Sequence, residues 1–101
     1  MKSAFWIGMA RIARVVVPGV PHHVTQRGNR RQRTFFTTGD FHEYTRLLAE
    51  FTRKHGVEIL AYCLMENHVH FAAVPSSEDS LRLAFGEVHR RYRAPWKGPL
   101  I

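Results

Sequence analysis

The feature that most restricts how this chain can fold is an apolar run that ends in a tight polar turn and resumes as an alternating strand. Residues 57–64 are almost entirely hydrophobic, Glu66–Asn67 is the predicted turn, and a second strand begins at His68. Strands joined by so short a turn pair antiparallel. Because strand side chains alternate between faces, His68 and His70 project from one face and their apolar neighbours from the other. The pattern predicts a β-hairpin with one apolar face and one face bearing two imidazoles.

The run at 57–64 is hydrophobic enough to predict a central strand of the sheet. It contains Cys63, the single cysteine, which cannot form an internal disulfide. A cysteine within such a run is predicted to be buried and unreactive, and a chain of this kind fits a reducing compartment.

One further strand and two helices are predicted from the remainder of the chain. The strand covers residues 21–27, although its residues do not alternate cleanly. A helix is predicted from Asp40, with Glu43 three residues on as a capping box, to Gly56. A second amphipathic helix is predicted over 80–93.

The predicted order β-α-β-β-α defines an α+β fold, a ferredoxin-like split β-α-β sandwich one strand short of the full unit. Helices are expected on one face of an antiparallel sheet, which leaves the other face for a ligand. The fold is therefore expected to be incomplete at its C-terminal end, with a possible open sheet edge.

A chain of 101 residues holds one domain. We assign residues 9–93 to that domain, and Met9 also looks like a natural start because the basic segment 10–14 follows it directly. Residues 1–8 are predicted to be a disordered extension, and 94–101 a tail in which two prolines prevent a further helix. No signal peptide or membrane span is apparent, so a cytoplasmic protein without membrane contact is expected.

The charge predicts a polyanionic partner, most simply nucleic acid. The net charge is +7, and twelve of the fifteen basic residues are arginine, which recognises phosphate through a planar pair of donors. A loop carries Asn29, Arg30, Arg31 and Arg33, with Arg27 just before it, and Arg90 and Arg91 end the second helix. We predict that these seven residues bind DNA, the alternative being a solvated basic surface. The phenylalanines that follow the loop, Phe35 and Phe36, are predicted to be mostly core.

The pair His68 and His70 is predicted to be half of a divalent metal site, because neutral imidazole is a common metal ligand. A polar outer sheet face is the alternative explanation for the same pattern.

Three blocks of the sequence carry a family resemblance. Pro18-Gly19, then HHVTQRGNRR at 22–31, then AYCLMENHVH at 61–70 resemble the HUH-type tyrosine transposases, most of all the single-strand transposases of insertion sequences and their REP-associated relatives. The likeness extends over residues 9–93 with the blocks in family order. It implies a ferredoxin-like catalytic domain that cleaves and rejoins single-stranded DNA at hairpin-bearing ends.

Carried onto this sequence, the resemblance implies that His68 and His70 are catalytic and hold Mg²⁺ or Mn²⁺. A tyrosine hydroxyl would then attack the scissile phosphate and form a 5′-phosphotyrosine link.

The sequence departs from the family after the second helix, where the nucleophilic tyrosine's helix is expected and does not follow. We therefore expect a C-terminally truncated transposase. Tyr92 is a conceivable substitute, but its place on an apolar helical stripe favours packing. Two further hypotheses are a tyrosine supplied in trans within a homodimer, and a non-catalytic module that binds single-stranded DNA or RNA.

Overall fold

A computed structural model describes residues 5–7, 15–28 and 32–92 of the chain. Within these ranges lie two helices and four strands, in the order β1, β2, α1, β3, β4 and α2. Their bounds are β1 Phe5–Ile7, β2 His22–Arg27, α1 Thr38–Lys54, β3 Val57–Met65, β4 His68–Pro75 and α2 Ser80–Arg91. The predicted order of strands and helices from β2 onwards is confirmed. Neither described helix is long and apolar enough to cross a membrane.

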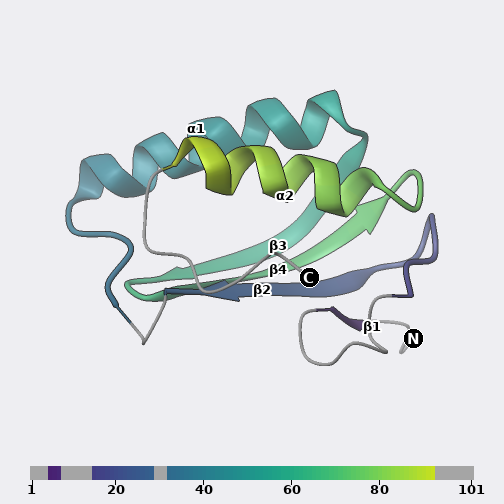
Figure 1. The fold of residues 1–101 in the computed structure, drawn as a ribbon, viewed down its shortest axis with the longest axis horizontal. Helices are drawn as coiled ribbons and strands as arrows, with labels where there is room; N and C mark the ends of the chain where they lie inside the picture. Colours follow the sequence, from purple (N-terminus) through teal and green to yellow (C-terminus); the bar gives the residue numbers. More distant parts are fainter. Residues whose placement is uncertain (1–4, 8–14, 29–31, 93–101) are drawn as a thin grey trace.

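The strands form one sheet in the order β1-β2-β4-β3, with both helices packed on the same face (Figure 1). Strands β2 and β3 each pair antiparallel with β4, which lies between them. This is the split β-α-β arrangement, since β2 and β3 run in the same direction and α1 connects them. The predicted α+β class is confirmed, and one face of the sheet is left uncovered by the helices.

The prediction that residues 57–64 form a central strand is wrong, because β4 occupies the centre and β3 lies at the edge. Leu60 and Tyr62 are accordingly 53% and 56% exposed, and the ladder is interrupted by a register shift between Ile59 and Ala61. Cys63 is exposed rather than buried. A long apolar run indicates a strand, but it does not specify whether that strand has a hydrogen-bonded neighbour on one side or on both.

The sheet edge beside β2 is occupied by β1, whose residues pair parallel with His22–Val24. This three-residue strand lies within residues 1–8, the segment predicted to be an extension outside the domain. The rest of that segment, and the predicted tail at 94–101, lie outside the described residues.

Helix α1 begins two residues before the predicted start. Thr37 is its N-cap, and a capping box forms between Thr37 and Asp40. The predicted box from Asp40 to Glu43 is therefore wrong, because the actual box lies three residues earlier, and Glu43 instead pairs with Arg46 on the helix surface. Either Thr37 or Asp40 can cap a helix, and Asp40 serves better as the third helical residue because its carboxylate accepts from the loop backbone.

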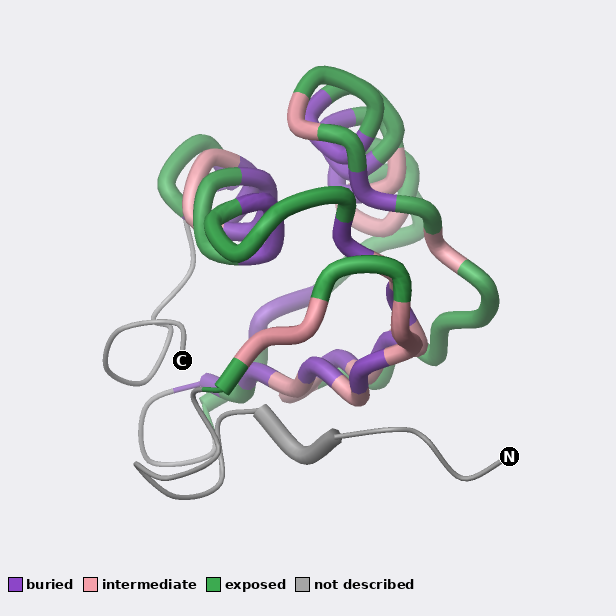
Figure 2. Tube along the Cα trace, turned by 90° about the vertical axis from the view of Figure 1, so that its right-hand side faces the viewer, coloured by how far each residue is buried: buried purple, intermediate pink, exposed green. Residues whose placement is uncertain are grey.

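The core lies between the helix layer and the inner face of the sheet. Figure 2 shows buried residues recurring on the sides of the helices and strands that face each other. Burial along β4 alternates strictly, with Val69, Phe71 and Ala73 turned inward. The helices contribute Tyr44, Leu47, Leu48, Phe51, Leu81, Ala84, Phe85 and Val88. The predicted apolar stripes and the inward face of the hairpin are thus confirmed.

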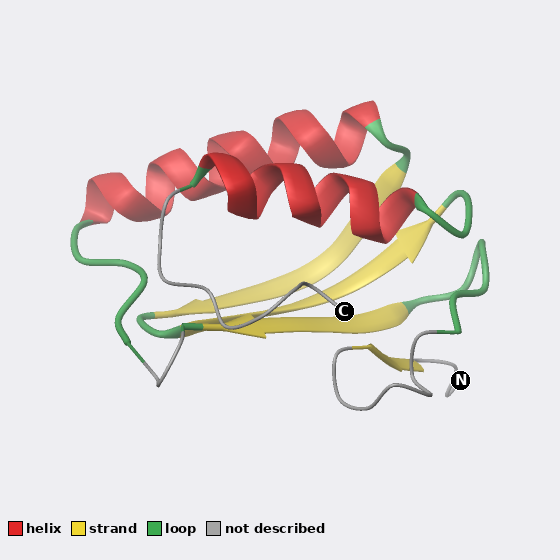
Figure 3. Cartoon of the chain, viewed as in Figure 1, coloured by secondary structure: helices red, strands yellow, loops and turns green. Residues whose placement is uncertain are grey.

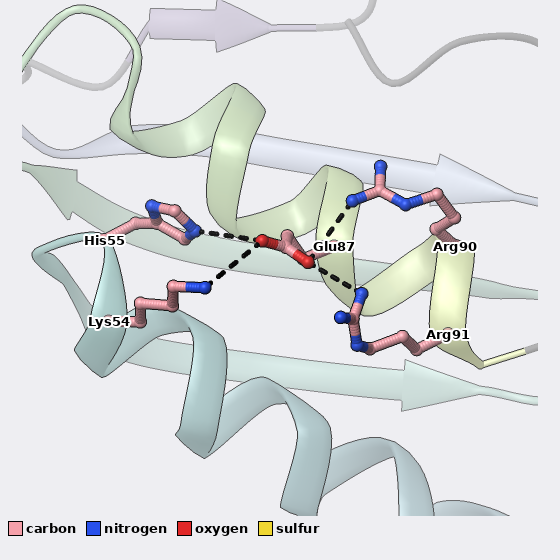
Figure 4. Close-up of polar contacts among 5 residues, drawn as sticks. All are labelled: Lys54, His55, Glu87, Arg90 and Arg91. Carbon is pink, nitrogen blue, oxygen red and sulfur yellow. Dashed lines mark hydrogen bonds and ion pairs between the residues drawn. The ribbon is translucent and has the colours of Figure 1, made fainter.

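A carboxylate and four basic side chains join the two helices at their surface (Figure 4). Glu87 of α2 accepts from Arg91 at 2.7 Å, lies 3.2 Å from Arg90, and reaches Lys54 and His55 at the end of α1. Burial alone would raise the pKa of Glu87, but the bond with His55 and the nearby cations outweigh it and lower that pKa. The Glu87 carboxylate thereby reduces the repulsion between the basic side chains of the two helices.

Candidate nucleic-acid and metal site on the open sheet face

The two predicted histidines lie on the sheet face away from the helices. Both are half-buried, whereas Val69 and Phe71, which alternate with them on β4, are buried. The ring centroids of the two histidines lie 4.7 Å apart, and the two ring planes are nearly perpendicular. In the register of β2 and β4, Arg27 pairs with His68 and Thr25 pairs with His70. The predicted outward placement of the pair is confirmed, and a basic residue flanks it.

The His68 ring is oriented by the turn that precedes it. Its Nδ1 lies 2.7 Å from the Asn67 side-chain oxygen. An amide oxygen only accepts, so His68 Nδ1–H is the donor and Nε2 keeps its lone pair. Burial, followed by the charges of His70 and Arg27, lowers the pKa of His68. The neutral ring is therefore favoured, in the tautomer that leaves Nε2 able to bind a metal ion.

The His70 ring is oriented by a third histidine. His23 Nε2 lies 3.2 Å from His70 Nδ1, and the two rings stack with centroids 5.2 Å apart. One proton is shared in this contact, and if His70 Nδ1–H donates it, His70 Nε2 is left with its lone pair. Burial, and then the neighbouring His70, lowers the pKa of His23, so the neutral form of His23 is favoured.

His23 and Asn67 are the two residues of this site that sequence reasoning did not assign to it. The alternation of β2 puts His23 on the same strand face as Arg27, but only the pairing register shows that it reaches His70. Asn67 was recognised as a turn residue, and its adjacency to His68 is the signal that could have indicated a second role.

The predicted DNA-binding residues do not form one patch. Arg27 is exposed beside the histidines, and Arg33 lies on the loop that connects β2 to α1. Arg90 and Arg91 belong to α2, in the layer on the other side of the sheet, where both pair with Glu87. The remaining three, Asn29, Arg30 and Arg31, lie outside the described residues.

The loop from β2 to α1 lies at the same end of the sheet as the β3–β4 turn (Figure 3). Gly28 N–H donates to Asn67 O at 2.8 Å, and Thr34 N–H to Glu66 O at 2.7 Å. A side chain at Gly28 would collide with the Gln32 carbonyl oxygen, so this position requires glycine. These hydrogen bonds attach both ends of the loop to the β3–β4 turn, which directly precedes His68.

None of the three tyrosines, all of which are described, lies on the histidine face. Tyr44 is fully buried between the helices and the sheet. Tyr92 is 8% exposed and donates its hydroxyl to Thr34 O at 2.6 Å, and burial raises its pKa to about 12. Tyr62 is exposed, but it pairs in register with Phe71 and therefore projects on the helix side.

These features define a class of protein, namely a split β-α-β domain with a histidine pair on its open sheet face and a basic loop beside it. Residues 17–85, well over half of the chain, match the family model described as "Transposase IS200 like". The chain therefore belongs to the IS200-like transposase family and takes part in DNA transposition. Comparison with curated proteins finds no match.

Proposed function

We propose that this chain binds single-stranded or hairpin DNA on its open sheet face, with a divalent ion at His68 and His70. The observation that carries the proposal is that both rings face outward and each has a partner at Nδ1. We assign the proton of the His23–His70 contact to His70 Nδ1, so that the Nε2 atoms of His68 and His70 both carry the lone pairs that would bind the ion. The basic loop supplies the phosphate contacts, and a cytoplasmic location is part of the same proposal.

The residues fit half of a coordination shell. Within residues 15–28 and 32–92, no group of three or more His, Cys, Asp or Glu side chains is arranged to hold a metal. The histidine pair thus provides two nitrogen ligands, and oxygens of DNA phosphate and water suit Mg²⁺ or Mn²⁺ for the rest. A bound ion would act as a Lewis acid on the scissile phosphate.

Cleavage through a phosphotyrosine intermediate requires a tyrosine that this chain does not bring to its own histidines. The buried and hydrogen-bonded Tyr92 hydroxyl is a poor nucleophile, since a pKa of about 12 leaves almost no phenolate near neutral pH. Tyr62, exposed at the sheet edge, is the one tyrosine that could reach the histidines of a second copy. We propose that adduct formation, where it occurs, uses a tyrosine supplied in trans.

The lack of a tyrosine on the histidine face also favours a second candidate function, namely binding without cleavage. Such a module would bind single-stranded DNA or RNA through the same loop and sheet face without cutting it.

The first test is incubation of the protein with end-labelled, hairpin-containing single-stranded DNA in Mn²⁺ or EDTA, with samples run on native and denaturing gels. We expect retarded DNA on the native gel and no covalent adduct on the denaturing gel. A Mn²⁺-dependent adduct that Tyr62→Phe removes would support a tyrosine in trans. An adduct that Tyr92→Phe alone removes would contradict the assignment of Tyr92 to the core, and absence of any retarded DNA would overturn the proposal.

The metal site is tested separately by calorimetric titration with Mn²⁺. Replacing both His68 and His70 with Ala should abolish Mn²⁺ binding and leave DNA retardation in EDTA unchanged, because phosphate contacts do not need the ion. The matched control is His42→Ala, which removes an exposed histidine from α1. Equal Mn²⁺ binding by the wild type and the double variant would refute the assignment.

A further inference from the structure

An exposed aromatic ring lies between the basic loop and α1. Phe36 is 65% exposed, the highest value among the large apolar side chains of the described residues. Its neighbour Phe35 is fully buried, stacked on Phe41 at 4.5 Å and in edge contact with Tyr44. The prediction that both phenylalanines are mostly core is therefore wrong for Phe36, whose ring is left in solvent.

The exposure of Phe36 does not result from a loose loop. Its backbone N–H donates to Asp40 Oδ2 at 2.7 Å, and Thr37 N–H donates to the same oxygen at 3.1 Å. Asp40 N–H in turn donates to Thr37 Oγ1, which completes the cap of α1. Phe36 is thus the last residue before a capped helix, and its position is fixed by that cap.

A guanidinium group is placed over the Phe36 ring. The Arg33 carbon Cζ lies 5.4 Å from the ring centroid, within the range of a cation–π contact. Arg33 is itself held, because its Nε–H donates to Phe35 O at 3.0 Å and its terminal nitrogen lies 3.9 Å from Glu66. The loop therefore presents a ring and a planar cation together.

The ring and the cation belong to the same rigid unit as the histidine strand. The Glu66 carbonyl oxygen accepts from Thr34 N–H at 2.7 Å, from Phe35 N–H at 3.2 Å and from the Thr34 hydroxyl at 3.2 Å. Glu66 begins the turn that continues through Asn67 into His68. Phe36 is consequently displayed at the end of the sheet where β4 and its histidines begin.

We propose that Phe36 and Arg33 form a stacking subsite for one unpaired base of single-stranded DNA. The proposal rests on the proposed DNA-binding function and adds to it a contact with a base rather than with phosphate. An aromatic ring in solvent contributes little to folding, whereas base stacking on such a ring strengthens single-strand binding irrespective of sequence. The adjoining guanidinium stacks on the base or bonds the phosphate beside it. A base in a paired stem is already stacked on both sides, so the subsite selects unpaired nucleotides.

The decisive comparison uses two strands with the same number of phosphates. One is oligothymidylate of about a dozen nucleotides, and the other is a strand of equal length made of abasic residues. Phe36→Ala should weaken the Kd for oligothymidylate about tenfold and leave the Kd for the abasic strand unchanged. Phe36→Trp should restore or exceed wild-type binding to oligothymidylate. Leu83→Ala, which removes an exposed apolar side chain from α2, is the matched control and should change neither Kd.

The possible failures are distinct. If the wild type binds neither strand, the proposed DNA-binding function is wrong and the subsite with it. If the wild type binds oligothymidylate and Phe36→Ala binds equally well, the subsite alone is wrong. Equal losses on both strands would assign Phe36 to loop geometry and also overturn the proposal. Oligouridylate of the same length serves as a third strand, and a tenfold loss on oligouridylate with none on oligothymidylate would overturn the DNA subsite and make RNA its ligand. Circular dichroism with an unchanged Tm shows that the variants are folded.

Discussion

His22 and His23 are adjacent in the sequence, yet the pairing of β2 turns them to opposite faces of the sheet. His22 is fully buried, and its ring bonds the segment that leads into β2. Its Nδ1–H donates to Val20 O at 2.6 Å, and its Nε2 accepts from Val17 N–H at 3.1 Å. Burial lowers the pKa of His22, so the ring stays neutral and both bonds persist. His22 is thus structural, whereas His23 faces the site.

Replacing His22 with Phe should destabilise the protein by about 2 kcal/mol, because it leaves a backbone donor and a backbone acceptor without their partner. The quantity to measure is the free energy of unfolding in urea. His42→Ala, at an exposed position, should change it by less than about 0.5 kcal/mol. Equal effects of the two substitutions would contradict the structural role of His22.

At this scale the alternation of residues along a strand predicts well which side chains point outward, as it does for His68 and His70. It cannot predict that His23 meets His70, because that contact depends on the register between strands distant in the sequence. Hydrophobicity, in turn, fails to predict the exposure of Cys63 and Phe36, which are apolar but exposed. Their exposure depends on what covers them, and sequence hydrophobicity does not report that.

Helices α1 and α2 meet through a polar contact inside the apolar core. The Tyr44 hydroxyl bonds His89 Nε2, and the two rings stack with centroids 5.5 Å apart. Burial lowers the pKa of His89 to about 3 and raises that of Tyr44. Both groups are therefore neutral in the folded protein over the physiological range.

The lowered pKa of His89 makes the helix contact sensitive to acid. The unfolded chain binds a proton near pH 6.5 and the folded one only near pH 3, so stability is lost as the pH falls through that interval. The loss is about 1.4 kcal/mol per pH unit. The double variant Tyr44→Phe with His89→Phe removes both polar groups and should lose this part of the pH dependence.

Urea unfolding of both proteins at about pH 7.5 and about pH 5.5 checks this prediction. The wild type should lose about 1.4 kcal/mol more than the double variant between the two values. The other histidines with lowered pKa values are present in both proteins, so their contributions cancel. Identical pH dependence of the two proteins would show that His89 is protonated without cost in the folded state.

Element order could be predicted from the sequence because each helix and strand has its own period and its own end signals. The amphipathic stripe of α1 and the hairpin of β3 and β4 are local patterns. The order of strands in the sheet is not local, which explains why β3 was expected at the centre. Strand β1 pairs with β2 over three residues, too short a segment to predict from periodicity.

The whole molecule has a net charge of +7, and its basic groups differ in how far they are already paired. Arg46 and Arg82 form ion pairs along their own helices, and Arg90 and Arg91 pair with Glu87. Arg27 is exposed beside the histidines. Phosphate binding is therefore expected to depend most on the loop end of the molecule.

Salt dependence tests this distribution of charge. Each phosphate contact with a single strand contributes about 0.7 to the slope of log K against log salt concentration. Replacing Arg30, Arg31 and Arg33 with Ala should lower that slope by about 2. Arg46→Ala combined with Arg82→Ala should leave it nearly unchanged. A triple variant with the wild-type slope would show that the loop does not contact phosphate.

The attachment of the loop to the β3–β4 turn has a consequence for redesign. Backbone N–H groups and the Thr34 hydroxyl hold the loop by donating to carbonyl oxygens of Glu66 and Asn67, and the Asp40 carboxylate holds the Phe36 N–H. The placement of Phe36 relative to His68 therefore depends little on the side chains at positions 33 and 36. The side chains at positions 33 and 36 can therefore be replaced together while the hydrogen bonds between the loop and the β3–β4 turn stay intact. A library randomised at those two positions alone would sample new nucleotide preferences on an unaltered scaffold.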